Sequence, residues 1–327
     1  MALHLVIMAG GSGTRFWPKS TSKRPKQLLA FSQNGPTLLT QTLTRFNGLV
    51  PADEGHRMIV TTQLLQKACA DEATGVRVLA EPQGRNTAPC VYWAAREIAA
   101  KDPQGVMLVM PADHYISKPE SFAATIREAA NWAETHDDLV TLGVKPSRPE
   151  TGYGYLRIGK ALGGASQVDA FVEKPNHEKA VEFLTAGNYL WNGGMFLWRA
   201  EVILKAFDAL MPEMKHEWEA CGGRVESAYP RLTATSIDYG IMEKAKNVVS
   251  FVLDCGWDDL GSWTSLEEMA DVLEARVENN VATGGEILAV ESAGNIVDAP
   301  GKLIALLGVK DLIIVEAGGV LLIADKN

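Results

Sequence analysis

The chain has 327 residues, of which 46% are hydrophobic and 22% are charged, a composition typical of a globular protein with one large domain and room for a smaller one. A net charge of -9 argues against a protein that coats nucleic acid, which needs a broad basic surface. No apolar run approaches the roughly 20 residues that span a bilayer, and the scattered cysteines form no Cys-x-x-Cys pair, so we expect a cytoplasmic protein without a membrane contact or a zinc site.

Positive charge is concentrated near the N-terminus. No acidic residue precedes Asp53, and five basic residues lie between Arg15 and Lys26. Local positive charge in an acidic protein favours a small polyanion held at one site. A solvated basic loop is the alternative.

The first half of the chain alternates apolar runs with helical patterns. The expected strands are Leu3–Met8, Met58–Thr61, Val76–Leu79, Val106–Met110 and Leu139–Gly143, and the clearest helices are Thr87–Ala100 and Glu120–Glu134. This alternation predicts an α/β fold whose mainly parallel sheet is covered by helices. Ligands of such sheets gather beyond the carboxyl ends of the strands.

From about Asn279 the pattern changes to short apolar runs separated by Gly, Asn and Asp. These runs are Ile287–Val290, Leu303–Leu307, Leu312–Val315 and Val320–Ile323. They predict a small β-rich domain, and a solenoid-like coil is one form it could take, although no strict repeat period is present. We therefore divide the chain into residues 1–275 and 276–327.

A glycine-rich loop follows the first expected strand. Its sequence is Ala9-Gly10-Gly11-Ser12-Gly13-Thr14-Arg15. A dinucleotide-binding loop would need a third glycine where Phe16 stands and an acidic residue about 20 positions later, and a Walker loop would need Gly-Lys-Ser/Thr. The loop is either a tight turn or an anion site built from backbone N–H groups.

Further motifs make the sequence resemble sugar-1-phosphate nucleotidyltransferases. The glycine-rich loop continues to Pro18 and is followed by Pro25-Lys26-Gln27-Leu28, a form similar to the mannose-1-phosphate guanylyltransferase branch. The other matching segments are Glu81-Pro82, Arg85-Asn86-Thr87-Ala88-Pro89, Pro111-Ala112-Asp113-His114, Thr151–Tyr155, Glu173-Lys174-Pro175, Trp191–Phe196, Ser236–Tyr239 and Gly256–Trp263. The resemblance extends from Met1 to about Glu274.

This resemblance implies both a fold and a reaction. The fold is the nucleotide-diphospho-sugar transferase fold, a Rossmann-like mixed, mainly parallel sheet flanked by helices, here with a C-terminal β-helix-like domain. The reaction transfers GMP from GTP to α-D-mannose 1-phosphate, giving GDP-mannose and pyrophosphate by Mg²⁺-assisted in-line attack on the α-phosphorus without a covalent intermediate. The alternatives are another sugar 1-phosphate or base, or a sugar-nucleotide-binding regulatory paralogue without activity.

The resemblance also implies a nucleotide site, in which Arg15 and Lys26 act as the catalytic cations. The nucleotide-binding residues are Ala9, Gly10, Gly11, Ser12, Gly13, Thr14, Arg15, Lys26, Glu81, Pro82, Arg85, Asn86, Thr87, Ala88 and Asp113. Within this set, the Glu81 carboxylate can accept from N1–H and the amino group of guanine, which adenine cannot reciprocate. An ion pair with Arg85 is the alternative role of Glu81.

Two aspartates are expected to bind the metal. Asp113 and Asp259 each follow an apolar run, and carboxylates with substrate phosphates are usual Mg²⁺ ligands. Each could instead cap the next helix. The resemblance implies that the two converge on Mg²⁺, and Asp258 competes with Asp259, which better matches the family's Asp-x-Gly pattern.

The sugar phosphate is expected in a second set of motifs. By resemblance the substrate-binding residues are Gly152, Tyr153, Gly154, Glu173, Lys174, Asn192 and Gly193. Without the family, Glu173 and Lys174 read as a surface pair and Trp191–Trp198 as core packing.

The resemblance also bears on the C-terminal segment. Longer members carry a cupin-type isomerase domain after it, and since this sequence stops at Asn327 we expect no phosphomannose isomerase activity. Family members often associate through such segments, so the resemblance allows a homodimer.

Overall fold

The structure is a computed structural model that describes residues 2–11, 13–32, 35–271 and 273–326. The chain forms two compact units, each built from three segments. The first unit comprises Met1–Gly10, Arg45–Pro111 and Lys118–Trp257, and the second comprises Gly11–Thr44, Ala112–Ser117 and Asp258–Asn327. The domain boundary at residues 275/276 stays a prediction.

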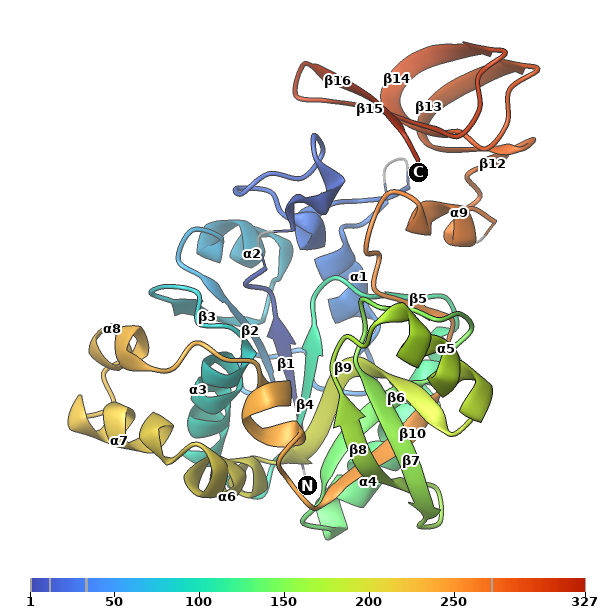
Figure 1. Ribbon diagram of the computed structural model, residues 1–327. Coiled ribbons are helices and arrows are strands. Elements are labelled where there is room, and N and C mark those ends of the chain that lie inside the picture. Colours follow the sequence, from blue (N-terminus) through green and yellow to red (C-terminus); the bar gives the residue numbers. More distant parts are fainter. Residues whose placement is uncertain (1, 12, 33–34, 272, 327) are drawn as a thin grey trace. The chain divides into compact units, whose positions relative to one another are not determined.

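A nine-stranded mixed sheet is the centre of the first unit (Figure 1). Its strand order is β3-β2-β1-β4-β9-β6-β10-β8-β7. The strands are β1 (Leu3–Met8), β2 (Arg57–Thr62), β3 (Arg77–Glu81), β4 (Val106–Pro111), β6 (Leu139–Val144), β7 (Tyr155–Ala161), β8 (Ser166–Val172), β9 (Tyr189–Arg199) and β10 (Val248–Leu253). Strands β3, β2, β1 and β4 run parallel to one another, whereas β9 runs antiparallel to both β4 and β6.

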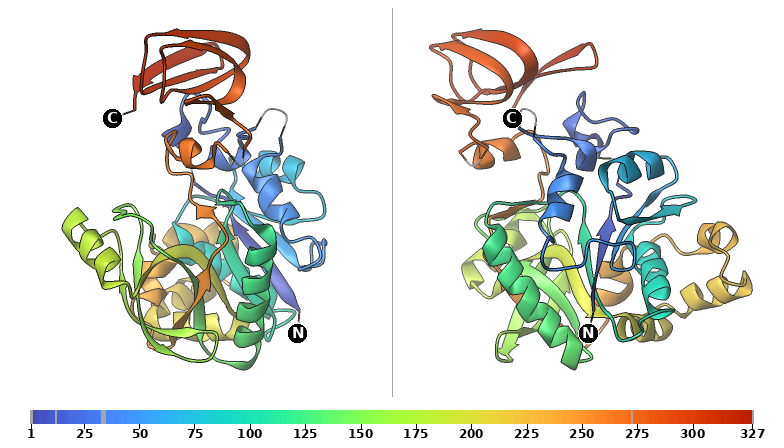
Figure 2. Two further views of the ribbon diagram at one scale, coloured as in Figure 1. Left: turned by 90° about the vertical axis from the view of Figure 1, so that its right-hand side faces the viewer. Right: turned by 180° about the vertical axis from the view of Figure 1, so that it is seen from behind.

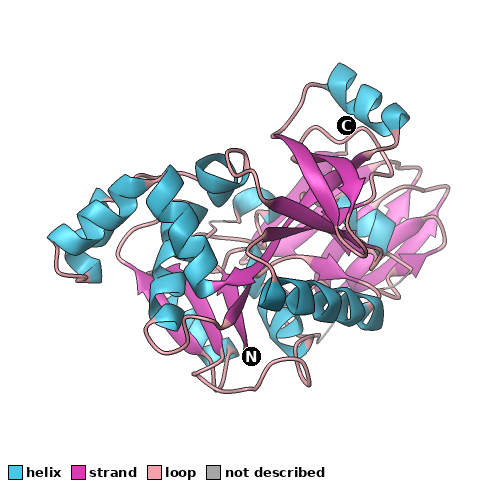
Figure 3. Cartoon of the chain, turned by 90° about the horizontal axis from the view of Figure 1, so that it is seen from below, coloured by secondary structure: helices cyan, strands magenta, loops and turns pink. Residues whose placement is uncertain are grey.

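Helices lie on both sides of this sheet (Figure 3). They are α2 (Gln66–Glu72), α3 (Thr87–Ala99), α4 (Pro119–Thr135), α5 (His177–Ala186), α6 (Ala200–Leu210), α7 (Pro212–Ala220) and α8 (Val225–Ala228), with a 3₁₀ turn η3 (Tyr229–Arg231) and a π-helix η4 (Asp238–Met242). The strands β1 and β4 are buried along nearly their whole length, as expected of parallel strands covered on two faces. The α/β fold expected from the sequence is confirmed.

The parallel strands bring several loops to one edge of the sheet. In register, Met8 of β1 lies beside Val60 of β2 and beside Pro111 of β4. Because all these strands run in one direction, the loops that follow Met8, Thr62, Glu81 and Pro111 leave from the same edge.

The second unit contains the glycine-rich loop and the C-terminal strands. Its elements are the 3₁₀ turns η1 (Thr14–Phe16) and η2 (Lys26–Leu28), α1 (Leu38–Thr44), β5 (Tyr115–Ile116), α9 (Ser265–Met269), β12 (Arg276–Val277), β13 (Asn280–Val290), β14 (Ile296–Leu307), β15 (Leu312–Ala317) and β16 (Val320–Asp325); β11 (Trp257–Asp258) straddles the two units. The side chains of Phe16, Phe31 and Trp263 pack edge-to-face with ring centroids 4.8–6.5 Å apart. These rings belong to one buried cluster with Val281 and Ile296 of the C-terminal strands.

The C-terminal strands form a five-stranded sheet in the order β12-β13-β14-β15-β16. Strands β13, β14 and β15 are parallel and follow one another as successive passes of a coil (Figure 2). The β-rich segment expected from the sequence is confirmed, and its parallel passes have the connectivity of a β-helix. Among the described residues, no helix combines the length and the apolar character that crossing a membrane requires.

Candidate active site

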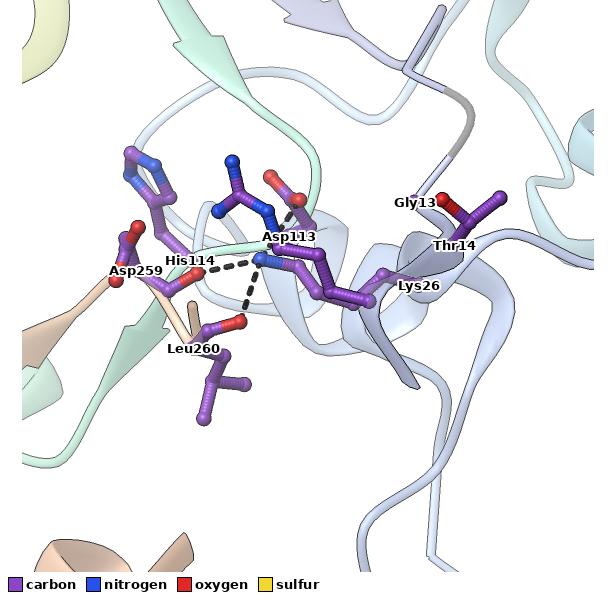
Figure 4. A pocket seen from close by; sticks show the side chains of 8 residues that line it. Gly13, Thr14, Lys26, Asp113, His114, Asp259 and Leu260 are labelled. Carbon is purple, nitrogen blue, oxygen red and sulfur yellow. Dashed lines mark hydrogen bonds and ion pairs between the residues drawn. The ribbon is translucent and has the colours of Figure 1, made fainter. Parts of the chain in front are cut away.

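A cavity of about 290 Å³ in the second unit collects the residues expected to hold phosphates (Figure 4). It is lined by Gly13, Thr14, Arg15, Lys26, Asp113, His114, Asp259 and Leu260. The two expected metal ligands, Asp113 and Asp259, are far apart in the sequence but line this same cavity. The structure thus brings two carboxylates and two cations to one site, an arrangement suited to a phosphate group with a hard cation.

Lys26 has three oxygen acceptors in this cavity. Its Nζ lies 2.8 Å from Oδ2 of Asp113 and 3.2 Å from the carbonyl oxygen of Leu260, and it also donates to the carbonyl oxygen of Asp259. An ammonium group has three donors, so these acceptors use its full capacity. The amine is therefore held at one point between the segments that carry the two aspartates.

Asp113 is held as a carboxylate although its side chain is partly buried. Desolvation raises its pKa, but the charge of Lys26, followed by His114 and the hydrogen bond from Lys26, outweighs that penalty and brings the pKa below its usual value. A carboxylate that stays ionised is what a cation site requires.

Asp258 and Asp259, the two candidates for the second metal ligand, have different surroundings in the structure. Asp258 is buried, and its Oδ1 accepts from the backbone N–H of Leu260 at 2.6 Å. This hydrogen bond supports a turn in which Leu260 has a φ of 48°, a left-handed conformation that costs a branched residue free energy. Asp258 thus shapes the turn, whereas Asp259 lines the cavity.

The glycines of the loop differ in whether the structure leaves room for a side chain. A Cβ at Gly13, which has a φ of 50°, would lie 2.5 Å from the backbone nitrogen of Lys26, and a Cβ at Gly10 would lie 2.9 Å from Oε2 of Glu81. Gly11 has open space around the same point. Gly13 and Gly10 are thus required by the protein itself, while the space beside Gly11 is available to a ligand. Ser12, also expected in the nucleotide site, lies outside the described residues.

Gln27 is a residue that the sequence reasoning did not assign. Its Nε2 donates to the carbonyl oxygen of Gly11 at 3.2 Å. The Pro25-Lys26-Gln27 segment therefore fixes the glycine-rich loop through Gln27 and also supplies the cavity with the Lys26 ammonium group. The signal was present, because Gln27 belongs to a quoted motif, but sequence spacing does not reveal a contact across 16 residues.

In the first unit, Glu81 ends β3 as a buried carboxyl group. Its side chain accepts a hydrogen bond from the hydroxyl of Tyr229, which is fully buried. Burial raises the pKa of Glu81 to about 7, and the Tyr229 hydrogen bond opposes this rise. The alternative expectation of a Glu81–Arg85 ion pair is wrong, since Arg85 donates to the carbonyl oxygen of Pro230 instead.

The remaining residues of the nucleotide motif build the start of α3. Asn86, with a φ of 67°, accepts from the N–H of Thr87 at 2.8 Å, and the Thr87 hydroxyl accepts from the N–H of Ile237 at 2.8 Å. Ala88 is fully buried, and its N–H donates to a carbonyl of the 229–237 segment. Pro82 is half-buried beside Glu81 and Ala9 is buried at the end of β1. Their contacts with a nucleotide stay predictions.

A second polar cluster of the first unit contains the expected sugar-binding residues. Lys174 Nζ donates to Oε1 of Glu173 at 2.7 Å, and a Cβ at Gly154 would lie 2.6 Å from Oε2 of Glu173. The backbone N–H of Asn192 donates to the carbonyl oxygen of Gly154 at 2.8 Å. The structure therefore brings Gly154, Glu173, Lys174 and Asn192 together, although they come from separate segments.

Asp238 is a member of this cluster that the sequence reasoning quoted in a motif but did not assign. Asn192 Nδ2 donates to its Oδ1 at 2.9 Å. Burial and then the nearby Glu173 charge raise the pKa of Asp238 to about 6, against the hydrogen bond from Asn192. Asp238 begins the π-helix η4, and short π-helical turns are frequent at functional sites.

The other expected sugar-binding residues have mainly structural contacts here. Gly193 is buried, and a Cβ there would lie 2.7 Å from the carbonyl oxygen of Leu142, at an irregular pairing of β6 with β9. Gly152 N–H donates to Oε1 of Glu150 at 2.9 Å. The Tyr153 ring packs against Trp191 and Trp257 with centroids 5.2 and 5.3 Å away.

Comparison with known proteins agrees with these motifs. A family model described as nucleotidyl transferase matches residues 4–276, and one described as a mannose-phosphate isomerase/GMP-like β-helix domain matches residues 285–327. Among curated proteins, the chain is 38% identical to a putative mannose-1-phosphate guanylyltransferase of Vibrio cholerae over 98% of this chain and 71% of that protein, and 38% identical to the mannose-1-phosphate guanylyltransferase of Escherichia coli K12 over 99% and 71%.

A solved structure matches the whole chain. It is described as mannose-1-phosphate geranyltransferase from Thermus thermophilus, has 35% sequence identity and a TM-score of 0.91, and the match covers 100% of this chain and 96% of that one.

Proposed function

The chain belongs to the mannose-1-phosphate guanylyltransferase family of nucleotidyl transferases, and we propose that it transfers GMP from GTP to α-D-mannose 1-phosphate and releases pyrophosphate. The observation that carries this proposal is the cavity where Arg15 and Lys26 meet the carboxylates of Asp113 and Asp259. The names of the curated relatives support mannose 1-phosphate as the acceptor.

The reaction needs positioning and charge neutralisation more than proton transfer. The attacking phosphate oxygen of the sugar phosphate is already an anion, so it has no proton to lose. In-line displacement at the α-phosphorus spreads negative charge over the phosphate oxygens and the departing pyrophosphate. Preorganised cations that face this charge lower the barrier because they need no reorganisation.

In this proposal Arg15 and Lys26 stabilise the pyrophosphate. Three oxygen acceptors already fix the Lys26 amine. A phosphate oxygen that enters the cavity therefore replaces one of these acceptors, and binding does not have to order a mobile lysine side chain. Asp113 is the acceptor best suited to exchange, because its carboxylate can turn toward another cation while the two carbonyls are fixed in the backbone. Arg15 is exposed at the rim and can offer its planar fork to two phosphate oxygens.

The two carboxylates of the cavity fit a Mg²⁺ ion. They are hard oxygen donors, Asp113 is held ionised, and the described residues contain no group of three His, Cys, Asp or Glu side chains that would close the coordination shell. Mg²⁺ commonly uses one or two carboxylates and completes its shell with substrate phosphates and water. Asp113 and Asp259 would hold the ion, which would neutralise phosphate charge when bound.

Two polar groups of the first unit are proposed to bind the guanine base and the sugar phosphate. They are the buried Glu81 carboxyl group and the cluster of Glu173, Lys174 and Asn192. Glu81 reads the guanine base through its carboxylate. Glu173 and Asn192 accept and donate to sugar hydroxyls, and Lys174, whose amine is well exposed, attracts the sugar phosphate. Asp238 accepts from the amide nitrogen of Asn192, while Thr141 and Gly194 donate to its amide oxygen, so these three groups together fix the amide that faces the sugar.

One assay tests the proposal. Pyrophosphate release is measured from GTP, ATP, UTP and CTP, each with mannose 1-phosphate or glucose 1-phosphate, with and without Mg²⁺. The proposal expects the highest kcat/KM for GTP with mannose 1-phosphate in the presence of Mg²⁺. Tight binding of GDP-mannose without turnover of any pair would indicate a regulatory paralogue, and preference for another pair would overturn the substrate assignment.

A further inference from the structure

The buried hydroxyl of Tyr229 contacts the carboxyl group proposed to read the base. It donates to Oε1 of Glu81, and both residues are buried: Tyr229 is 0% exposed and Glu81 is 4% exposed. On the other side, Oε2 of Glu81 faces the Gly10 backbone, where a Cβ would lie 2.9 Å away. A carboxylate oxygen has lone pairs for more than one donor, so the Tyr229 bond orients the group without exhausting it.

Tyr229 itself is fixed by neighbours of the same motif. Its ring packs edge-to-face on Trp93 of α3 with centroids 5.7 Å apart. Arg85, four residues after Glu81, donates to the carbonyl oxygen of the next residue, Pro230. The segment that begins at Tyr229 is therefore tied to the Glu81 motif at two consecutive residues, which leaves the hydroxyl little freedom to turn away.

The protonation state of Glu81 decides which purine it complements. An ionised carboxylate only accepts hydrogen bonds and so matches the adjacent N1–H and 2-amino donors of guanine. A protonated carboxyl group has one donor and one acceptor and so matches N1 and the 6-amino group of adenine. A group that keeps this carboxyl ionised and oriented thereby selects guanine over adenine.

We propose that Tyr229 is a specificity-determining residue, which acts through Glu81 by holding its carboxylate in the orientation and charge state that accept guanine. This inference rests on the proposed guanylyl transfer, and Tyr229 lies outside all the sequence motifs that the chain shares with the family. Tyr229 is a positioning residue, since its hydroxyl is occupied by Glu81.

The groups that face Glu81 are consistent with this role. They are the Tyr229 hydroxyl from η3 and the Cys90 thiol from α3. Burial raises the pKa of both, so that the phenol stays a donor and the thiol stays neutral at physiological pH. Among the described residues, the Tyr229 hydrogen bond is the interaction that lowers the pKa of Glu81 against its desolvation.

The test is the pH dependence of the preference for GTP over ATP. For the wild-type enzyme, the ratio of the two kcat/KM values should fall as pH decreases through about 7, because Glu81 becomes protonated. In Tyr229→Phe the ring still packs on Trp93 but the hydrogen bond is lost, so the midpoint of this fall should move to higher pH by about one to two units. The ratio cancels both the titration of the triphosphate and any difference in the folded fraction.

Two further variants make the outcome decisive. Glu81→Gln should give a low ratio that does not depend on pH, and Tyr229→Phe should lower it no further in that background. Tyr92→Phe removes another buried tyrosine hydroxyl from the same core and should leave the profile at its wild-type position. An unmoved midpoint in Tyr229→Phe would overturn the inference while guanylyl transfer stands, whereas failure of the wild type to form GDP-mannose would overturn the proposed function itself.

Discussion

Single residues around the cavity lined by Arg15, Lys26, Asp113 and Asp259 explain why the motifs there have such a restricted composition. Gly13 has a left-handed φ of 50° and its Cα faces the backbone of Lys26, while Gln27 holds the carbonyl of Gly11. Pro25-Lys26-Gln27 and the glycine-rich loop are therefore two halves of one packed structure. A change in the glycine-rich loop should therefore displace Lys26 in the other half.

Gly13→Ala tests this coupling. The new Cβ would stand 2.5 Å from the Lys26 nitrogen, closer than real contacts allow, so the backbone must shift in addition to the left-handed strain of about 1–2 kcal/mol. We expect kcat/KM for GTP to fall on the order of 100-fold, as measured in steady-state assays. Gly163→Ala is the matched control, because Gly163 has a φ of 76° but nothing near its Cβ position, and it should lose stability without this loss of activity.

The two strand-end aspartates give the second prediction at this scale. Asp259→Ala removes a carboxylate from the cavity but keeps the carbonyl that binds Lys26, so the protein should fold and kcat/KM should fall on the order of 10²–10³-fold. Asp254→Ala, at an exposed carboxylate paired with Lys118, is the control and should behave as wild type. Near-normal turnover of purified Asp259→Ala would remove its role in holding a cation.

At the scale of elements, the sequence predicted regular structure well and long-range partners poorly. Leu3–Met8 is observed with the predicted bounds, and the predicted helix at Thr87 ends within one residue of α3. Periodicity fixes such elements locally. The π-helix at Asp238 has no such pattern, and the contacts of Gln27, Tyr229 and Asp238 join segments that only the fold brings together.

The π-helix η4 places the half-buried Asp238 beside Asn192 and Glu173, at the expense of stability. The pKa of Asp238 is raised to about 6, so the folded state binds a proton more tightly than the unfolded state. The resulting stabilisation is complete below the unfolded pKa of 3.8 and is lost as pH rises through about 6. At neutral pH the ionised Asp238 therefore lowers the free energy of unfolding by on the order of 3 kcal/mol at most.

Asp238→Asn should accordingly stabilise the protein at neutral pH. The amide oxygen can still accept from Asn192, while the partly desolvated charge beside Glu173 is gone. Thermal unfolding should show a higher Tm than wild type at about pH 7.5 and a difference that shrinks toward about pH 4. Activity with mannose 1-phosphate should fall in the same variant, a trade-off common at functional sites. An equal Tm difference at both pH values would contradict the assigned cause.

At the scale of the whole molecule, the C-terminal strands contact the segment that follows the glycine-rich loop within the second unit. Lys19, just after the glycine-rich motif, forms an ion pair with Asp298 of β14, and their side chains are 17% and 1% exposed. The Lys19 amine also lies 5.7 Å from the centre of the Phe31 ring, which packs on Phe16. The β-rich segment thus provides the buried anion that neutralises a basic residue of the loop.

This ion pair predicts a strong coupling between distant segments. Lys19→Met leaves the Asp298 carboxylate buried without a cation and should lower the free energy of unfolding by about 3–5 kcal/mol. Lys19→Met combined with Asp298→Asn leaves no buried charge and should recover most of that loss, giving a large coupling energy in a double-mutant cycle of denaturant unfolding. Lys67→Met, which breaks an exposed pair with Asp71, should change stability little. Additive losses in the cycle would show that the C-terminal strands support the loop by packing alone. Strong coupling would mean that the β-rich segment holds Lys19 in place through the Asp298 charge, and with it the segment that follows the glycine-rich loop.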